Sequence, residues 1–403
     1  MRVATANAYD STIDLLAKRQ ADLANQQERL ATGKRVLKPS DDPVAATLAE
    51  TAANRLSRVQ ADLRALESSR TSLQQAESAL AESGNLMQRV RELLVTAGNG
   101  TFGPSEREDI ARQLEGLREQ LLGVANLRDN AGRTLFGGLG GAQVPFVDTY
   151  GPPSAGVVFA GQRGQAAAGN TSLPQALDGD AIWMRIPRGN GSFTLALDPA
   201  NAGSVRTDLG QVSDPGLLTG AEYEIGFAEV AGQMQFNVFD QTNGVSVLSG
   251  VPYVAGQTVS FDGLSIRMDG NPADGDRVAV RPATAPTDIF RVVQDAIDAL
   301  RYQGANRGAH QAQELGRVMT ELDAGMDRVL LARGRAGEWL NRADSLDSLL
   351  KGRSNDFEIE KSRLEDLDMI KGISDFQNKQ VALEAALKSY AQVQRLSLFQ
   401  FVG

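Results

Sequence analysis

The chain has 403 residues, with 41 basic and 50 acidic side chains, a net charge of −9, one histidine and no cysteine. These numbers exclude disulfide frameworks, thiolate metal sites, thiol nucleophiles and any site that needs two imidazoles. The acidic balance predicts no nucleic-acid binding, and the lack of an apolar run of about 20 residues predicts no membrane insertion. The single histidine, His310, is expected to be a solvated surface residue.

Glycine and proline divide the chain into three regions. Of 41 glycines, 24 lie between residues 137 and 275, and of 14 prolines, 11 lie between residues 137 and 286. Both residue types interrupt helices and build turns, so we predict two helix-rich flanks around a turn-rich centre.

The first 42 residues carry a thin apolar stripe. Its members are Ile13, Leu16, Leu23 and Leu30. Isolated helices are marginal in water and gain most of their stability from packing, so a stripe this narrow needs a partner. That partner is either another subunit or the far end of the same chain.

A long helix and a shorter one follow the stripe. The long helix should start at Pro43, after the acidic cap Asp41-Asp42. A capping-box pattern at Ser105 should begin a second helix that folds back on the first. In the long helix, apolar residues recur at every seventh position, which is typical of coiled-coil packing. They are Val59, Leu66, Leu73, Leu80, Met87 and Leu94.

The centre, residues 141–286, carries short β-rich runs separated by turn residues. Turns are predicted at Asn243-Gly244, at Asp262-Gly263 and as a hairpin at the acidic segment 269–276. The glycine-rich segment 137–141 is expected to be a linker. We predict a β-rich domain inserted at the tip of a helical hairpin.

The last flank contains no proline. A helix should begin at Thr287-Asp288, and the seven-residue spacing resumes at Leu315 after glycines at 304 and 308. Apolar residues at the very end of the chain favour burial between molecules, because soluble monomers rarely expose such clusters. The C-terminal apolar residues are Ile370, Ile373, Phe376, Leu383, Leu387, Tyr390, Leu396, Leu398, Phe399 and Phe401.

The predicted fold is α+β and multidomain. The two flanks form a long antiparallel helical bundle or coiled coil, and the centre forms an inserted β-rich outer domain. The predicted segments are an N-terminal assembly helix (1–42), a helical body (43–140 and 287–365), the β-rich outer domain (141–286) and a C-terminal assembly helix (366–403).

Several motifs resemble the bacterial flagellin superfamily. Residues 30–36 and 39–46 resemble its N-terminal signature, and residues 88–93 resemble a second motif. Residues 132–138 and the closing residues 396–400 are more similar to the branch of the superfamily that joins hook and filament than to flagellins. Together the matches cover both flanks and leave the β-rich insert unmatched.

The resemblance implies a structural subunit of the extracellular bacterial flagellum, exported through the flagellar type III channel. It implies self-assembly into a ring at the hook-filament boundary through paired terminal helices. The implied partners are copies of the chain, the adjacent hook-associated protein, flagellin and a cytoplasmic export chaperone. A flagellin that forms the filament itself is one alternative, and a filament protein with a glycan-binding or glycosidase insert is an alternative of another class.

The apolar stripes and the resemblance together indicate three sets of site residues. The assembly surface comprises Ile13, Leu16, Leu23, Leu30, Ile373, Phe376, Leu383, Leu387, Tyr390, Leu398 and Phe399. The family signature loop comprises Gly33, Lys34, Arg35, Ser40, Asp41, Asp42 and Pro43. The candidate chaperone-binding residues are Leu383, Leu387, Tyr390, Leu396 and Phe399.

No catalytic, cofactor-binding or metal-binding residues are expected, and the chain is not expected to be an enzyme. The acidic segment 269–276 lacks the ligand order of a calcium loop. Trp183 is the only tryptophan of the insert, so an aromatic platform for sugars is poorly supplied.

Overall fold

The computed structural model describes residues 2–98, 102–140, 142–149, 156–165 and 173–402, and it describes side chains only from residue 10 to residue 392. The chain forms two compact units. Unit 1 comprises residues 1–64 and 345–403, and unit 2 comprises residues 65–344. The division falls inside two long helices, α2 (Pro43–Ala97) and α6 (Arg307–Glu365). The five segments proposed from the sequence stay a prediction.

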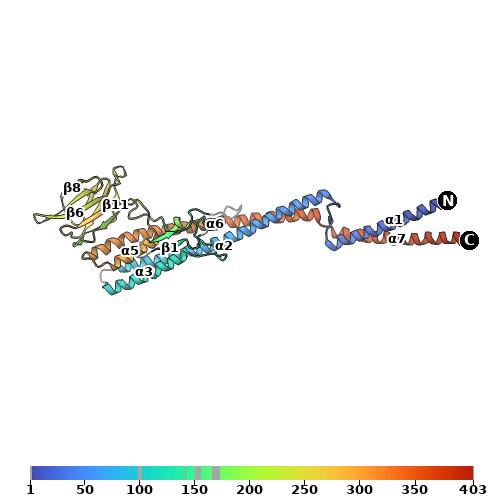
Figure 1. The fold of residues 1–403 in the computed structure, drawn as a ribbon, viewed down its shortest axis with the longest axis horizontal. Coiled ribbons are helices and arrows are strands. Elements are labelled where there is room, and N and C mark those ends of the chain that lie inside the picture. Colours follow the sequence, from blue (N-terminus) through green and yellow to red (C-terminus); the bar gives the residue numbers. More distant parts are fainter. Residues whose placement is uncertain (1, 99–101, 141, 150–155, 166–172, 403) are drawn as a thin grey trace. The chain divides into compact units, whose positions relative to one another are not determined.

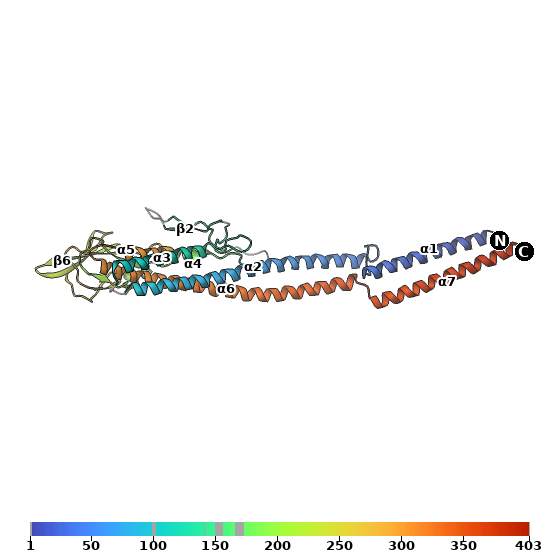
Figure 2. The same ribbon diagram turned by 90° about the horizontal axis from the view of Figure 1, so that it is seen from below.

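Unit 1 contains α1 (Arg2–Thr32) and α7 (Met369–Val402) together with the start of α2 and the end of α6. Figures 1 and 2 show α1 and α7 side by side and antiparallel. On α2, three small residues at helical spacing are buried: Ala45, Ala49 and Ala52. Small side chains allow another element to pack close to the helix backbone at this face.

The helical core of unit 2 is formed by α2, α3 (Pro104–Ala125), α5 (Ile289–Arg301) and α6, which lie alongside one another in Figures 1 and 2. The heptad prediction is confirmed, because all six of its residues are buried, with exposed fractions between 0 and 8%. Each such side chain contributes roughly 1.5–3 kcal/mol of burial free energy. Val59 belongs to unit 1, and the other five belong to unit 2.

The predicted start of α3 is wrong by one residue. The helix begins at Pro104, its N-cap Gly103 makes no side-chain bond, and the Ser105 hydroxyl contacts the neighbouring carboxylate of Glu106 instead. Proline at the first helical position explains the shift, because its fixed φ suits that position. α2 ends at Ala97.

α5 begins where the sequence predicts. Asp288 is its N-cap, and the carboxylate Oδ1 accepts the backbone N–H of Arg291 at 2.8 Å. Burial raises the pKa of Asp288 to about 6, although this hydrogen bond and the charge of Arg118 oppose the shift.

The raised pKa of Asp288 makes stability depend on pH. Between about pH 4 and pH 6 the folded chain holds a proton on Asp288 that the unfolded chain has released. The contribution of this proton to the free energy of unfolding is therefore fully present at low pH and is lost as pH rises through 6. Asp288→Asn keeps a capping side chain without the charge. We expect the variant to be more stable than the wild type at about pH 7.5, by up to about 3 kcal/mol, with the difference shrinking toward pH 4. Denaturant unfolding at both pH values measures this, and a pH-independent difference would contradict it.

The turn-rich centre packs first onto the helices. Trp183, the last residue of α4 (Gly179–Trp183), is fully buried, with edge contacts to Phe136 at 4.5 Å and Phe146 at 5.4 Å between ring centroids. Phe146 begins β1 (Phe146–Asp148), which pairs antiparallel with β2 (Val157–Phe159). This aromatic cluster joins the same core as α2, α3, α5 and α6.

The linker prediction for residues 137–141 is wrong. Gly138 has φ +69°, and a Cβ there would lie 1.8 Å from the carbonyl oxygen of Gln162. The N–H of Leu139 donates to that carbonyl at 2.9 Å, and the N–H of Gln162 donates to Gly137 at 3.2 Å. The glycines therefore permit close packing of two backbones; Gly141 lies outside the described residues.

Two antiparallel sheets form the rest of the β-rich region. The strand order in the larger sheet is β3-β11-β6-β7-β8, and in the smaller sheet β10 pairs with β4, β5 and β9. The strands are β3 (Phe193–Leu197), β4 (Arg206–Thr207), β5 (Gln211–Val212), β6 (Tyr223–Val230), β7 (Gln233–Asp240), β8 (Val245–Pro252), β9 (Thr258–Phe261), β10 (Leu264–Asp269) and β11 (Arg277–Pro282), with a short 3₁₀ turn at Pro215–Leu217.

Two of the predicted turns join hairpins. Asn243-Gly244 lies between the paired strands β7 and β8, and Asp262-Gly263 lies between the paired strands β9 and β10. The hairpin predicted at 269–276 is wrong, because β10 and β11 belong to different sheets. Asp276 is buried there and accepts the N–H groups of Ala202 and Ala273, both at 2.8 Å, which organises a connection between the sheets.

Polar side chains on α6 hold the β-rich region to the helices. Gln313 is buried; its Oε1 accepts the N–H of Thr207 at 2.7 Å, and its Nε2 donates to the Thr207 hydroxyl at 2.7 Å. Glu321 is also buried and accepts the N–H of Gly189 at 2.8 Å. Arg317, one turn before Glu321, binds its carboxylate at 2.9 Å.

Candidate assembly surface at the terminal helices

The signature loop, residues 33–42, is built by two aspartates and a glycine. Gly33 ends α1 with φ +71°, a conformation that glycine adopts without strain. Asp41 Oδ2 accepts the N–H groups of Leu37 and Lys38, both at 3.1 Å. Asp42 Oδ1 accepts the N–H of Ala45 at 3.0 Å and so caps α2. These hydrogen bonds lower the pKa of both carboxyl groups, so both caps are ionised at neutral pH and weaken only in acid.

The loop binds the junction between α6 and α7. The N–H of Arg35 donates to the carbonyl of Glu365 at 2.7 Å, and the guanidinium of Arg35 donates to the carbonyl of Leu364 at 2.9 Å. The ammonium group of Lys34 lies 2.8 Å from the carboxylate of Glu365, which raises the pKa of Lys34. The N–H of Leu367 donates to the carbonyl of Gly33 at 2.8 Å. Segments more than 300 residues apart are thereby joined.

The pair of α1 and α7 contains a buried polar residue, Gln26, among its described side chains. Gln26 is 5% exposed; its Nε2 donates to the carbonyl of Gly372 at 3.1 Å, and its Oε1 accepts Lys379 Nζ at 3.3 Å. A Cβ on Gly372 would lie 2.7 Å from a methyl group of Leu367 and 3.2 Å from one of Leu30. A buried polar group with a specific partner favours one register over others in helix pairs.

The predicted assembly residues fall into two groups. Half-buried side chains are Leu16, Leu23, Leu30, Phe376, Leu383 and Tyr390. Exposed side chains are Ile13 (43%), Ile373 (47%) and Leu387 (44%). The side chains of Leu396, Leu398 and Phe399 lie outside the described residues, and the signature residues Ser40 and Pro43 are exposed.

Part of the apolar surface of α7 is left uncovered within unit 1. Ile370 is 85% exposed and Val381 is 65% exposed, and with Ile373 they follow helical spacing on the side of α7 opposite the buried Gly372. Val381 escaped the sequence prediction, because only the observed packing shows which side of α7 it occupies.

Neither a membrane segment nor a metal site emerges from the described parts of the chain. No helix there is long and apolar enough to cross a membrane. No group of three or more histidine, aspartate or glutamate side chains within those ranges is placed to hold a metal ion.

Unit 1 contains the paired terminal helices, and unit 2 contains the helical core and the β-rich region. The model of the bacterial flagellin N-terminal helical region matches residues 3–140. Over its full length the chain is similar to the flagellar hook-associated protein 3 of Escherichia coli, with 26% identity and 99% of each chain covered. It is also similar to the crystal structure of the flagellar junction protein FlgL from Legionella pneumophila, with a TM-score of 0.66 and 25% identity over 74% of this chain and 99% of that one.

Flagellins match less closely over a similar length. Flagellin A of Vibrio anguillarum is 22% identical over 94% of this chain and 93% of its own. The resemblance to the flagellin superfamily, and within it to hook-associated protein 3, is therefore confirmed. The predicted fold class is confirmed as well.

Proposed function

We propose that the chain is the adaptor that joins hook to filament in the bacterial flagellum, assembled outside the cell through its terminal helices. The observation that carries the proposal is the match to hook-associated protein 3 over 99% of both chains. The terminal helix pair supports it, because α7 keeps a second apolar side after packing on α1. Copies of the chain, a hook-associated protein and flagellin are the proposed neighbours.

The distribution of lysine allows a direct test of assembly through the ends. All lysines of the chain lie in unit 1: Lys18, Lys34, Lys38, Lys351, Lys361, Lys371, Lys379 and Lys388. A lysine-specific endoprotease therefore cuts only this unit and releases residues 39–351 as a fragment without an internal cleavage site.

We expect exposed Lys18 and Lys388 to be cut readily in the free subunit and at least about tenfold more slowly in purified flagella, because helix burial blocks local opening. Lys351 lies on α6 and not on a terminal helix, so its cleavage rate serves as the internal control. Mass spectrometry of the digests gives the rates. Equal rates at the terminal lysines before and after assembly would exclude burial of the ends.

We propose further that a cytoplasmic chaperone covers the C-terminal part of α7 before export. Leu387 is 44% exposed, and an amphipathic helix with such residues suits burial in a partner's groove. The proposed contact includes Leu383, Tyr390, Leu396 and Phe399 as well. Co-purification from the cytoplasm should capture the chaperone with the full chain and lose it after deletion of residues 383–403; retention would refute this contact.

The proposed role is structural and involves no catalysis. A glycan-binding insert is disfavoured, because Trp183 is fully buried in the core and offers no surface for a sugar ring. We expect the full chain to show no binding to immobilised glycans and no glycosidase activity.

A further inference from the structure

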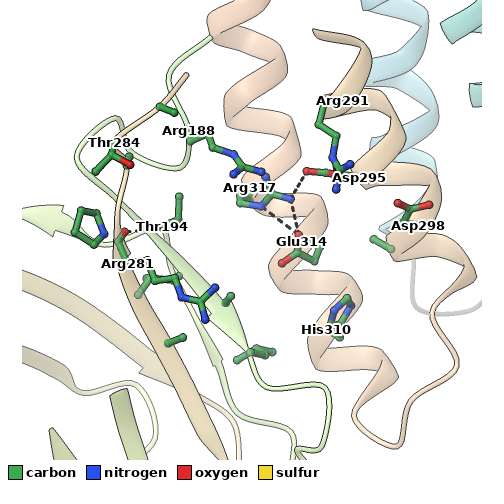
Figure 3. A pocket seen from close by; sticks show the side chains of 18 of the residues that line it. Arg188, Thr194, Arg281, Thr284, Arg291, Asp295, Asp298, His310, Glu314 and Arg317 are labelled. Atoms are coloured by element: carbon green, nitrogen blue, oxygen red, sulfur yellow. Dashed lines mark hydrogen bonds and ion pairs between the residues drawn. The ribbon is translucent and has the colours of Figure 1, made fainter. Parts of the chain in front are cut away.

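A solvent-open cleft separates the larger β-sheet from α5 and α6, all within unit 2. Its volume is about 540 Å³. One wall is the outer side of β3 and β11, where Ala279 lies opposite Ala196 and Arg281 lies opposite Thr194. The other wall is formed by α5 and α6. Figure 3 shows side chains from both walls pointing into the space.

The helical wall is charged, but its charges are paired. Arg317 binds Asp295 at 2.8 Å, Glu314 at 2.7 Å and Glu321 at 2.9 Å. Arg291 binds the other oxygen of Asp295 at 2.7 Å. The charges of these side chains are therefore balanced by partners within the protein.

His310 does not add charge to this wall. Contrary to the sequence prediction it is half-buried, stacked on Tyr302 with ring centroids 3.8 Å apart. Burial lowers the pKa of His310, so the imidazole is neutral at physiological pH. Asp298 accepts a hydrogen bond from Gln294 at 3.0 Å.

The sheet side contributes positive charge that remains available. Arg188 has no ion-pair partner among the described residues, and Arg281 reaches Glu222 only at 3.9 Å with both side chains well exposed. In Figure 3 Arg188 extends toward Arg317, and Arg281 extends toward His310. Their planar guanidinium groups suit bidentate binding of carboxylates.

The cleft also suits an extended chain. Its sheet wall carries small side chains, Ala196 and Ala279, so a peptide backbone can approach the sheet. Ala196 is exposed and Ala279 is half-buried, so this part of the sheet face is open to a ligand.

We propose that this cleft is a docking site for an extended acidic segment of a partner protein, with its carboxylates on Arg188 and Arg281. The partner is defined by charge complementarity, since the available charge in the cleft is guanidinium on an otherwise acidic chain. The proposal does not depend on the junction role.

The test measures fluorescence anisotropy of a fluorescein-labelled peptide of alternating glutamate and serine, titrated with the full-length chain at low salt. Its counterpart with glutamine in place of glutamate is the peptide control. We expect saturable binding of the glutamate peptide and at least tenfold weaker binding by the double variant Arg188→Gln, Arg281→Gln. The double variant Arg206→Gln, Arg267→Gln changes net charge equally but lies outside the cleft, and should bind within twofold of the wild type.

A steric variant separates docking from general attraction. Ala196→Trp keeps every charge and fills the cleft from its sheet wall, so it should also weaken binding at least tenfold. The far-ultraviolet circular dichroism of this variant should stay unchanged. Absence of saturable binding, equal binding of the glutamine peptide, equal weakening in the two double variants, or unchanged binding by folded Ala196→Trp would each overturn the proposal.

Discussion

Replacing Arg317 with methionine should lower the free energy of unfolding of unit 2 by about 3–5 kcal/mol, the range found when one partner of a buried charge network is removed. Arg317 is 11% exposed and is the contact shared by three carboxylates, those of Asp295, Glu314 and Glu321. The side chain of Glu321 is fully buried, and its carboxylate also accepts the N–H of Gly189. Without Arg317 the carboxylates repel one another or must take up protons.

The matched control for this experiment is Arg112→Met. Arg112 also pairs with a carboxylate on its own helix, Asp109, but both side chains are more than 60% exposed. Exposed pairs contribute roughly 0–1 kcal/mol, so this variant should stay close to the wild type in urea unfolding. If Arg317→Met lowered the free energy of unfolding no more than Arg112→Met does, the ion pairs of Arg317 on α6 would not be a determinant of stability.

The second large effect is expected in the terminal helix pair. Leu23→Asp on α1 and Leu383→Asp on α7 place a charge among half-buried apolar side chains. Burying an unpaired charge is costly, so we expect each variant to be absent from purified flagella and to abolish swimming when it replaces the wild-type chain. Unit 2 should be unaffected, since neither residue belongs to it.

Two measurements separate assembly from export in these variants. Gln380→Asp introduces the same charge at an exposed position of α7 and should assemble normally. The Leu23→Asp chain, which leaves the proposed chaperone contact intact, should accumulate in the culture medium. Normal incorporation of either chain would remove the helix pair from the assembly mechanism, and retention in the cytoplasm would assign the defect to export.

The sequence predicted those parts of the fold that depend on local periodicity. The heptad from Val59 to Leu94 and the Asp288 cap are local signals, and both are confirmed. The sequence could not predict contacts between distant segments. From the sequence alone, Gln313 would be placed on the solvent-exposed polar face of a helix, yet its side chain bonds Thr207 across 106 residues.

The same limit applied to the candidate site. The apolar stripes indicated that both chain ends need a partner, but not how each stripe divides between a covered and an open side. That division depends on the packing of α1 on α7, where Gln26 bonds Gly372 across 346 residues. Gly138 is another example, because its close approach to Gln162 shows only in the folded backbone.

Immunogold electron microscopy of intact flagella tests the central claim most directly. The antibody should be raised against residues 145–285, which lie outside the terminal helices. The adaptor role predicts gold particles confined to the boundary between hook and filament. Particles along the whole filament would contradict it and would assign the chain to the filament itself.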